Sequence, residues 1–376
     1  MSAYGTPSPE GPVPGAELLE PVGGIGARVR GLTDHAAVRF VARRVVALVA
    51  QLFVVTVVMF ALTNTVPADP VAANLSVEAQ ADPEVVAAYR EKHGLDDSLP
   101  KQYLTYMGNL LHGDFGISMQ TGNPIADDLR DVVPASFELA GAAMILAVVL
   151  GVGLGIVSGV RLLPRPLEAL LNGWSLVALS IPVFWLALLA YYFLFYKAGI
   201  FPGGGRLESG AAAPPTVTGF YTIDALIAGQ LDTFVDAVKH LIMPALVLAA
   251  DTIALLMRFT SAAVRESMGN AYVRSARGQG LKEVTVILQY IVRPALLSII
   301  TVAGLAFGTL LSGTVLVESI LNWPGLGEYA FRSTVALDLP AIVGVSIVIA
   351  GVFIVVNFFV DVCYVLIDPR LRGTTT

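Results

Sequence analysis

The sequence predicts an all-α membrane protein with six transmembrane helices. Hydrophobic residues make up 55% of the 376 residues, charged residues only 14%, and the mean hydropathy is +0.73. A soluble core of this size needs fewer apolar residues. A bilayer core of about 30 Å takes about 20 helical residues, longer than a barrel strand. Six apolar segments reach that length: 45–66, 139–160, 174–196, 241–259, 296–320 and 342–367.

Basic residues predict the orientation of these spans. The N-terminal segment, the connector at Arg161, the connector between the fourth and fifth spans and the C-terminal segment together hold 15 of the 23 lysines and arginines. All four would lie on one side, and segments rich in Arg and Lys stay in the cytoplasm. Both termini are therefore expected to be cytoplasmic.

Four parts are expected along the chain: a disordered extension (1–38), a first transmembrane helix (39–66), an extracytoplasmic loop domain (67–136) and a core with five further helices (137–372). The extension is rich in proline and glycine and has no early apolar run typical of a signal peptide. In the loop domain, Asp82 is expected to cap a helix that ends at Gly94. Its eleven acids against four bases leave two interpretations open, a solvated lid or a landing surface for an extracytoplasmic protein.

The second outer loop, 197–240, contains three consecutive glycines, Gly203, Gly204 and Gly205. Glycine is conformationally permissive, and these glycines together with the stretch 211–215 are predicted to be flexible. Nothing in its composition assigns it a role.

The sequence lacks the motifs that several kinds of catalysis and metal binding require. No lysine follows a glycine, so there is no P-loop, and no Gly-x-Ser-x-Gly elbow is present. The four histidines lack the spacing of metal ligands, and Cys363, the one cysteine, has no partner for an intramolecular disulfide. The chain is therefore not expected to be an enzyme, and any energy must come from a gradient or from another subunit.

Three carboxylates fall within the predicted spans. Glu318 and Asp361 lie near span ends, where solvent or an arginine would stabilise them. Asp251 lies deeper, and either a polar pathway or a partner inside the protein would explain it. A gradient-driven carrier would use such a group, although one carboxylate is thin support for a proton relay.

The connector between the fourth and fifth spans has the composition of a docking surface. Basic residues alternate there with small ones such as Ala271, Gly278 and Gly280. A short helix with small residues on its packing side can seat in a cleft, and Gly280 can end it through a positive φ. Arg274 and Arg277 share a helix face. They would serve either as docking residues or as positive-inside anchors. The connector contains six basic residues in all: Arg258, Arg265, Arg274, Arg277, Lys282 and Arg293.

From about Arg39 to Arg372 the chain resembles the permease subunits of dipeptide and oligopeptide ABC importers. The most specific match is Trp323-Pro324-Gly325-Leu326-Gly327, after the fifth span. Shorter matches are Gly94-Leu95-Asp96 and Gly113-Asp114-Phe115-Gly116 in the outer loop, Ile181-Pro182-Val183 in the third span, and Asp368-Pro369-Arg370.

The resemblance implies a type I ABC importer permease fold with a cytoplasmic coupling helix at about 271–281 that docks on an ATPase. It implies an outer gate, or binding-protein interface, at the Trp-Pro-Gly turn and in the first outer loop. The alternative is that Trp323 is an ordinary interfacial aromatic and the turn an ordinary one. The coupling positions are Tyr272, Arg274, Ser275, Ala276, Arg277, Gly280 and Leu281; the gate positions are Glu318, Trp323, Pro324, Gly325, Leu326, Gly327, Asp114 and Phe115; Asp251 is the pathway candidate.

The resemblance also implies partners in a bacterial cytoplasmic (inner) membrane. These are a second homologous permease, two cytoplasmic ATPases that hold the ATP and Mg²⁺, and an extracytoplasmic substrate-binding lipoprotein. No cofactor bound by this chain and no nucleic-acid partner is expected. Peptide is the implied cargo, while nickel chelates, haem, glutathione and glycosides occur among relatives. The other interpretations are a stand-alone, gradient-driven transporter or channel, which should carry an inverted repeat, and a static scaffold.

Overall fold

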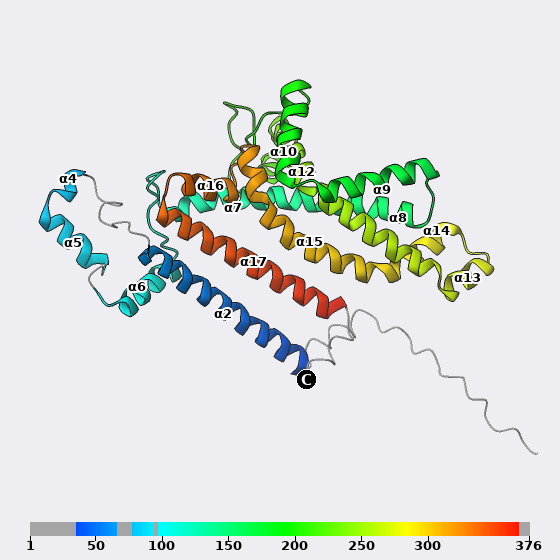
Figure 1. Cartoon of the computed structure of the whole chain (residues 1–376), viewed down its shortest axis with the longest axis horizontal. Helices are drawn as coiled ribbons and strands as arrows, with labels where there is room; N and C mark the ends of the chain where they lie inside the picture. Colours follow the sequence, from blue (N-terminus) through cyan, green and yellow to red (C-terminus); the bar gives the residue numbers. More distant parts are fainter. Residues whose placement is uncertain (1–34, 66–76, 94–96, 368–376) are drawn as a thin grey trace, which may run out of the picture. The chain divides into compact units, whose positions relative to one another are not determined.

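The computed structural model describes residues 35–65, 77–93 and 97–367, and the regular elements in these ranges are all helices (Figure 1). The chain divides into two compact units, Met1–Val45 and Val46–Thr376, and the first contributes only the start of one helix to the described residues. The predictions for residues 1–34, Gly94 and the Asp368-Pro369-Arg370 motif fall outside the described residues.

The α-helices are α2 (His35–Thr65), α4 (Val77–Gln80), α5 (Pro83–His93), α6 (Leu99–Leu111), α7 (Ile125–Leu146), α8 (Gly153–Gly159), α9 (Arg165–Ser180), α10 (Val183–Ala190), α11 (Tyr221–Ile227), α12 (Leu231–Met268), α13 (Ala271–Gly278), α14 (Glu283–Thr285), α15 (Arg293–Ile320), α16 (Leu326–Val335) and α17 (Leu339–Ile367). Three π-helical segments join some of them: η2 (Ala147–Val152), η3 (Tyr191–Lys197) and η4 (Val286–Val292). As predicted, the side chain of Asp82 caps α5 by accepting a hydrogen bond from the Glu84 N–H at 3.0 Å.

The membrane-spanning character is confirmed, and the span count depends on how bent helices are treated. Within the described residues, four helical stretches are long and apolar enough to cross a bilayer: Ala42–Thr63, Ile125–Gly159, Leu231–Met268 and Leu339–Phe358. Two further pairs qualify only together, one bent by 109° and the other by 49°. The six predicted spans are obtained if each bent pair counts as one.

The third predicted span, 174–196, is not one continuous helix. α9 ends at Ser180, and α10 begins at Val183 after a bend of 109°. Pro182 causes the break, since a proline ring disfavours the helical conformation of the residue before it. Ile181 is accordingly extended, with φ −87° and ψ 125°.

The second span is longer than predicted. α7, η2 and α8 form a helical stretch of 35 residues, Ile125–Gly159, that begins well before residue 139. The predicted boundary between the loop domain and the core, at residues 136 and 137, therefore lies inside α7.

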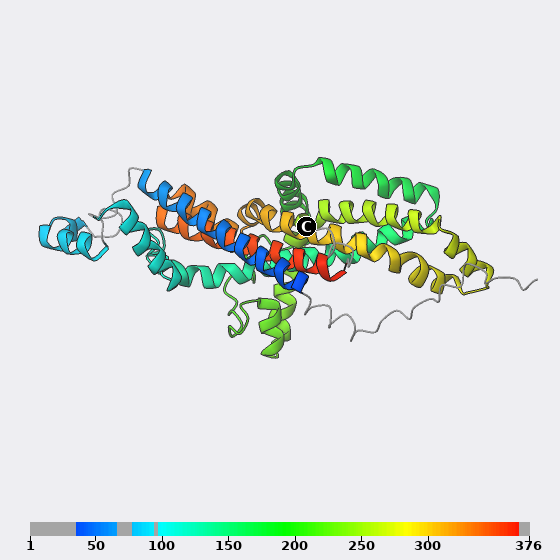
Figure 2. The same ribbon diagram turned by 90° about the horizontal axis from the view of Figure 1, so that it is seen from below.

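α12 is the central helix of the second unit. It packs against α15, α7, η2, α8 and α9, and Figures 1 and 2 show it running beside α9 and α15. Its apolar face supplies much of the largest buried cluster, where Leu248 and Leu256 meet Leu139 of α7 and Leu310 of α15. At one end α12 follows α11, and at the other it leads into α13. Movement of α12 therefore involves both ends of the bundle.

A row of glycines lets α8 and η2 approach α12 closely. A Cβ atom on Gly151 would lie 2.9 Å from the Ile253 carbonyl oxygen, and one on Gly155 would lie 2.6 Å from the Thr260 Cβ and 2.8 Å from the Met257 carbonyl oxygen. Four-residue spacing puts these glycines on one helix face, as in the Gly-x-x-x-Gly motifs of membrane helices. The four-residue spacing of this motif is readable in the sequence, but the motif was not among the predicted features.

Gly155→Ala is expected to destabilise the protein by about 1–3 kcal/mol, because the new methyl group overpacks a close helix contact. Gly153→Ala is the matched control, since nothing lies within 4 Å of a Cβ at that position. Unfolding of both variants in detergent by titration with SDS measures the difference. Equal stability of the two variants would contradict the close packing of α8 on α12.

Candidate functional site

The Trp-Pro-Gly turn is built around the buried side chain of Glu318. This carboxylate is fully buried and accepts hydrogen bonds from the Ser136 hydroxyl at 2.6 Å, the Gly327 N–H at 2.6 Å and the Glu328 N–H at 3.3 Å. The prediction that solvent or an arginine stabilises Glu318 is wrong, because α7 and the N-terminus of α16 supply the donors. The carboxylate thus ties α15, α7 and α16 together.

Trp323 is 1% exposed, and its indole N–H donates to the Ala135 carbonyl oxygen at 2.9 Å. The interpretation as an interfacial aromatic is therefore wrong. Gly325, Leu326 and Gly327 are buried as well, whereas Pro324 is exposed. The gate residues predicted in the turn therefore mostly shape it from inside, and among these Pro324 is the one that a partner can touch.

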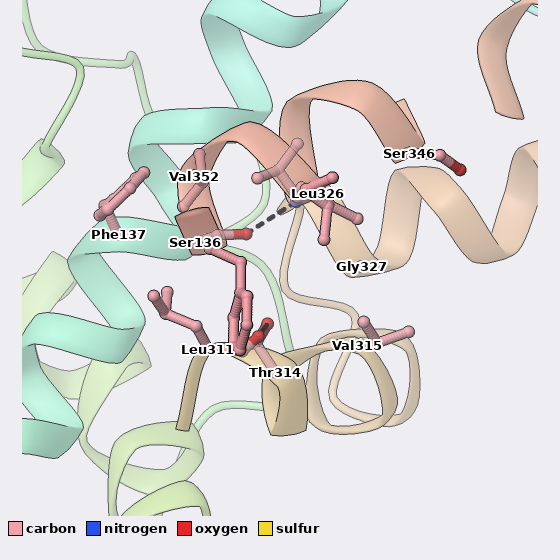
Figure 3. A pocket seen from close by; sticks show the side chains of 12 residues that line it. Ser136, Phe137, Leu311, Thr314, Val315, Leu326, Gly327, Ser346 and Val352 are labelled. Atoms are coloured by element: carbon pink, nitrogen blue, oxygen red, sulfur yellow. Dashed lines mark hydrogen bonds between the residues drawn. The ribbon is translucent and has the colours of Figure 1, made fainter. Parts of the chain in front are cut away.

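A cavity of about 380 Å³ lies beside this turn, between α7, α15, α16 and α17 (Figure 3). Its lining is mostly apolar and includes Phe137, Leu311 and Phe353. Ser136 lies at its edge, where its hydroxyl accepts a hydrogen bond from the Leu326 N–H at 2.7 Å. The packing behind the turn is therefore looser than the hydrogen-bonded side.

A buried ion pair that the sequence analysis missed lies next to the turn. Arg206 Nη2 is 2.6 Å from Glu138 Oε2, and the two side chains are only 6% and 4% exposed. Arg206 also donates to the Gly219 carbonyl oxygen at 2.6 Å and stacks on the Tyr221 ring at 3.5 Å. Its guanidinium lies 5.9 Å from the Trp323 ring. Arg206 therefore joins α7, the second outer loop and the Trp-Pro-Gly turn.

The three glycines before Arg206 are packed, so the prediction of flexibility is wrong for these residues. The Gly205 N–H donates to the Asn322 carbonyl oxygen at 3.0 Å, and a Cβ on Gly204 would lie 2.8 Å from the Leu321 carbonyl oxygen. Glycine fits this close contact because it has no side chain, and Gly204 and Gly205 both have positive φ. The loop is thereby held against the turn after α15.

Further along the same loop, Asp224 is 1% exposed and accepts hydrogen bonds from the backbone N–H groups of Val217, Thr218 and Gly219. Burial alone would raise the pKa of Asp224, but these bonds and one from the Thr218 hydroxyl outweigh it and hold the pKa below its usual value. The loop contact is therefore present at neutral pH and is lost only as the pH falls through that lowered pKa.

The first outer loop is anchored near the turn. Phe115 packs in the same apolar cluster as Leu326, whereas Asp114 is exposed and accepts a hydrogen bond from the Gly116 N–H at 2.9 Å. The Ser118 hydroxyl donates to the buried Asp338 carboxylate at 2.6 Å. The two parts of the predicted gate thus share one apolar cluster, which contains Leu326 and against which Phe115 packs.

At the other end of α12, α13 confirms the predicted short helix in the connector. Val273 and Ala276 are buried against Val264, Val286 and Ile291. Ala276 therefore packs inside this chain and does not offer a surface to a partner, contrary to its predicted docking role. The exposed coupling positions are Tyr272, Arg274, Ser275, Arg277, Gly280 and Leu281.

The end of α13 is fixed by Gly280 and by an ion pair. Gly280 has φ +74°, as predicted, and α14 starts after Lys282. Arg277 Nη2 lies 2.6 Å from Glu283 Oε1. This hydrogen-bonded pair raises the pKa of Arg277 and lowers that of Glu283. Of the two arginines predicted to dock, Arg274 is the one with no ion-pair partner within the described residues.

Gly280→Ala is expected to cost about 1–2 kcal/mol, because an L-residue with a Cβ is strained in the left-handed region. Gly278→Ala is the control, since this glycine is helical, has open space around it and gains helix propensity. Thermal unfolding of the two variants measures the effect. A more stable Gly280→Ala variant would contradict the turn geometry.

Asp251 is exposed on α12, although its neighbours Thr252, Ile253 and Ala254 are buried. It accepts hydrogen bonds only from Thr252, from the N–H at 2.6 Å and the hydroxyl at 3.2 Å. The alternative of an internal charged partner thus finds no support in the described part of the chain. Nor do the described residues contain three His, Cys, Asp or Glu side chains grouped as metal ligands.

Comparison with known proteins agrees with the sequence motifs. Residues 151–373 match the family described as binding-protein-dependent transport system inner membrane component, and residues 37–140 match the N-terminal region of such membrane components. A probable D,D-dipeptide transport system permease protein of Escherichia coli (strain K12) is 40% identical, over 85% of this chain and 93% of its own. A di/tripeptide transport system permease protein of Pseudomonas aeruginosa (strain UCBPP-PA14) is 36% identical, over 89% of this chain and 98% of its own length. The predicted resemblance is therefore confirmed, and the chain belongs to the family of inner-membrane permease components of binding-protein-dependent ABC importers.

Proposed function

We propose that this chain is one of two permease subunits in an ATP-driven importer of di- and oligopeptides. The observation that carries this proposal is the similarity, over 85–89% of the chain, to proteins named as dipeptide and di/tripeptide permeases. A second, homologous permease would complete the pathway, and two ATPase subunits would hold the ATP and Mg²⁺. An extracytoplasmic binding protein would deliver the peptide. This chain would be a non-catalytic subunit in a bacterial inner membrane, with both termini in the cytoplasm.

The coupling mechanism follows from how α13 is held. An ATPase would contact its exposed side chains, such as Tyr272 and Arg274, while Val273 and Ala276 fix the helix to the end of α12 and to η4. A displacement of α13 is then transmitted to α12, whose 38 residues span about 57 Å at about 1.5 Å per residue. The far end of α12 adjoins α11 and the loop that carries Arg206.

The Trp-Pro-Gly turn would act as part of the outer gate. Glu318, Trp323 and Gly327 give it a fixed shape, and Pro324 presents it to the binding protein. Hydrogen bonds to α7 and the contact with the second outer loop make the turn move with these elements. A rigid gate element of this kind can follow a motion of α12 and α15 without unfolding.

Reconstitution tests the proposal. The chain is assembled in liposomes with a second permease, the ATPases and a binding protein from the same organism, and uptake of a radiolabelled dipeptide is measured. ATP-dependent uptake that requires every subunit is the expected result. Solute accumulation by the purified chain alone, driven by an ion gradient, would overturn the proposal in favour of a secondary transporter.

Charge reversal at Arg274 tests the coupling surface. Arg274→Glu is expected to lower co-purification of the ATPases and ATP-dependent uptake, because the change reverses the charge of an exposed side chain on the proposed docking helix. Arg161→Glu is the control, since Arg161 is exposed in the turn after α8, outside α13. Normal assembly and uptake with Arg274→Glu would remove Arg274 from the docking surface.

A further inference from the structure

The uncovered face of α12 carries a charged residue every seven positions. Asp251, Arg258 and Arg265 are all exposed, whereas 18 of the 38 residues of the helix are buried. Seven residues are just under two helical turns, so the three side chains lie on one face. The face runs from the middle of the predicted fourth span toward the end that carries α13.

The charges of Asp251 and Arg258 are not neutralised within the described part of the chain. Asp251 bonds only to Thr252, and Arg258 makes no ion pair there. Arg265, by contrast, is paired with Glu168 of α9 at 2.7 Å. Unpaired ionised side chains inside a span are costly against lipid and usually border a polar cavity. This face of α12 is therefore expected to border a water-filled space and not the acyl chains of the lipid.

A cavity of about 250 Å³, lined by both polar and apolar residues, opens beside Arg258 and the paired Arg265, between α8, α9 and α12. The buried residues Ser158 and Ser261 line it, and the Ser261 hydroxyl donates a long hydrogen bond of 3.5 Å to the Ser158 hydroxyl, whose own proton can be donated elsewhere. The exposed Asn172 side chain adds an amide donor. A guanidinium with amide and hydroxyl donors around it suits a carboxylate. The volume is below the roughly 300 Å³ of a complete ligand pocket, so it fits one end of a molecule.

The spacing of the two free charges fits a short peptide. The Cα atoms of residues seven apart on a helix are separated by about 10.5 Å along the axis. An extended chain spans at most about 3.3–3.6 Å per residue, so the termini of a di- or tripeptide lie about 7–10 Å apart. The flexible arginine side chain takes up the remaining difference.

We propose that Asp251 and Arg258 form a cargo site on α12, in which Asp251 binds the α-ammonium group and Arg258, with Asn172, binds the α-carboxylate of a short peptide. The site rests on the proposed peptide-import function and assigns it specificity-determining residues in the permease itself. A lipid phosphate would suit Arg258 and Asn172, but it would leave Asp251 unpaired on the same face. The observations therefore favour a zwitterionic cargo.

Uptake kinetics of the assembled transporter test the site. At a saturating concentration of binding protein, Arg258→Gln and Asp251→Asn are each expected to slow uptake of a dipeptide at least tenfold. Arg161→Gln, an exposed arginine outside the cavity, should transport at the wild-type rate. Wild-type rates in Arg258→Gln would overturn the cargo site, even if that variant had lost a bound anionic phospholipid in native mass spectrometry. A wild-type complex that imports no peptide would instead overturn the proposed function.

A labelling experiment tests the face without relying on transport. Cys363 is the only cysteine, so Cys363→Ala provides a clean background for a cysteine at Ala262, an exposed residue that lines the cavity. In the assembled transporter, an anionic water-soluble thiosulfonate should modify Ala262→Cys faster than a cationic one. Adding Arg258→Gln should abolish that preference. Failure of both charged reagents to react, while a lipid-soluble maleimide reacts, would place the face against lipid and overturn the proposal.

Discussion

Arg206→Met is expected to lower the free energy of unfolding by about 3–5 kcal/mol, because it leaves the Glu138 carboxylate charged and buried without its cation. The pair is 2.6 Å apart and almost completely buried, so water cannot replace the lost partner. Methionine keeps much of the side-chain volume but none of the donors to Glu138 and to the Gly219 carbonyl oxygen. SDS titration of the protein in detergent micelles measures the loss.

The exposed pair between Arg332 and Glu328 provides the control. It is 3.3 Å long, and the Arg332 side chain is 58% exposed. Arg332→Met should therefore cost only about 0.3–0.5 kcal/mol. In a double-mutant cycle, Glu138→Gln combined with Arg206→Met should cost less than the sum of the two single changes, since the double variant buries no unpaired charge. Strict additivity would contradict a direct interaction between the two side chains.

Loss of Arg206 is also expected to affect transport beyond its effect on stability. The guanidinium stacks on Tyr221, which begins α11, and lies near Trp323 in the turn. Without it, the second outer loop loses its link to the Trp323 side of the turn but keeps the hydrogen bonds from Thr222 to Glu138 and from Gly205 to Asn322. A drop in uptake at a temperature where the variant remains folded would separate this positioning role from simple unfolding.

Hydropathy and local backbone rules predicted the features that depend on neighbouring residues. The apolar segments, the cap at Asp82 and the positive φ of Gly280 follow from residue type and spacing. The break before Pro182 was also readable, because proline restricts the preceding residue. Because the apolar segment 174–196 is long enough to cross a bilayer, one continuous span was predicted there instead of two helices.

Contacts between distant residues could not be predicted in the same way. Glu138 and Arg206 are 68 positions apart, and Ser136 and Glu318 are 182 apart. A single sequence shows that these groups are charged or polar, but not which of them meet. Glu318 was therefore assigned to solvent or to an arginine, although its donors come from α7 and from backbone N–H groups of α16.

Gly327→Ala is expected to destabilise the Trp-Pro-Gly turn by about 3 kcal/mol or more, since overpacking is combined with disrupted buried hydrogen bonds. A Cβ atom there would overlap the Val315 Cα and lie 2.9 Å from Glu318 Oε2. The backbone of α15 cannot rotate away as a flexible side chain could. α16 would have to move, which would break the hydrogen bond from the Gly327 N–H to Glu318.

Gly313→Ala, on α15, is the control for this prediction. A Cβ at Gly313 would make an ordinary contact of 3.5 Å with Leu248, and alanine raises helix propensity. SDS titration should therefore find Gly313→Ala within about 1 kcal/mol of the parent protein. If Gly327→Ala is equally mild, α16 does not pack as closely on α15 as described, and the turn cannot act as a rigid gate element. If it is severe, the glycine is required because α15 and α16 touch at that point, and Glu318 is buried there for the same reason.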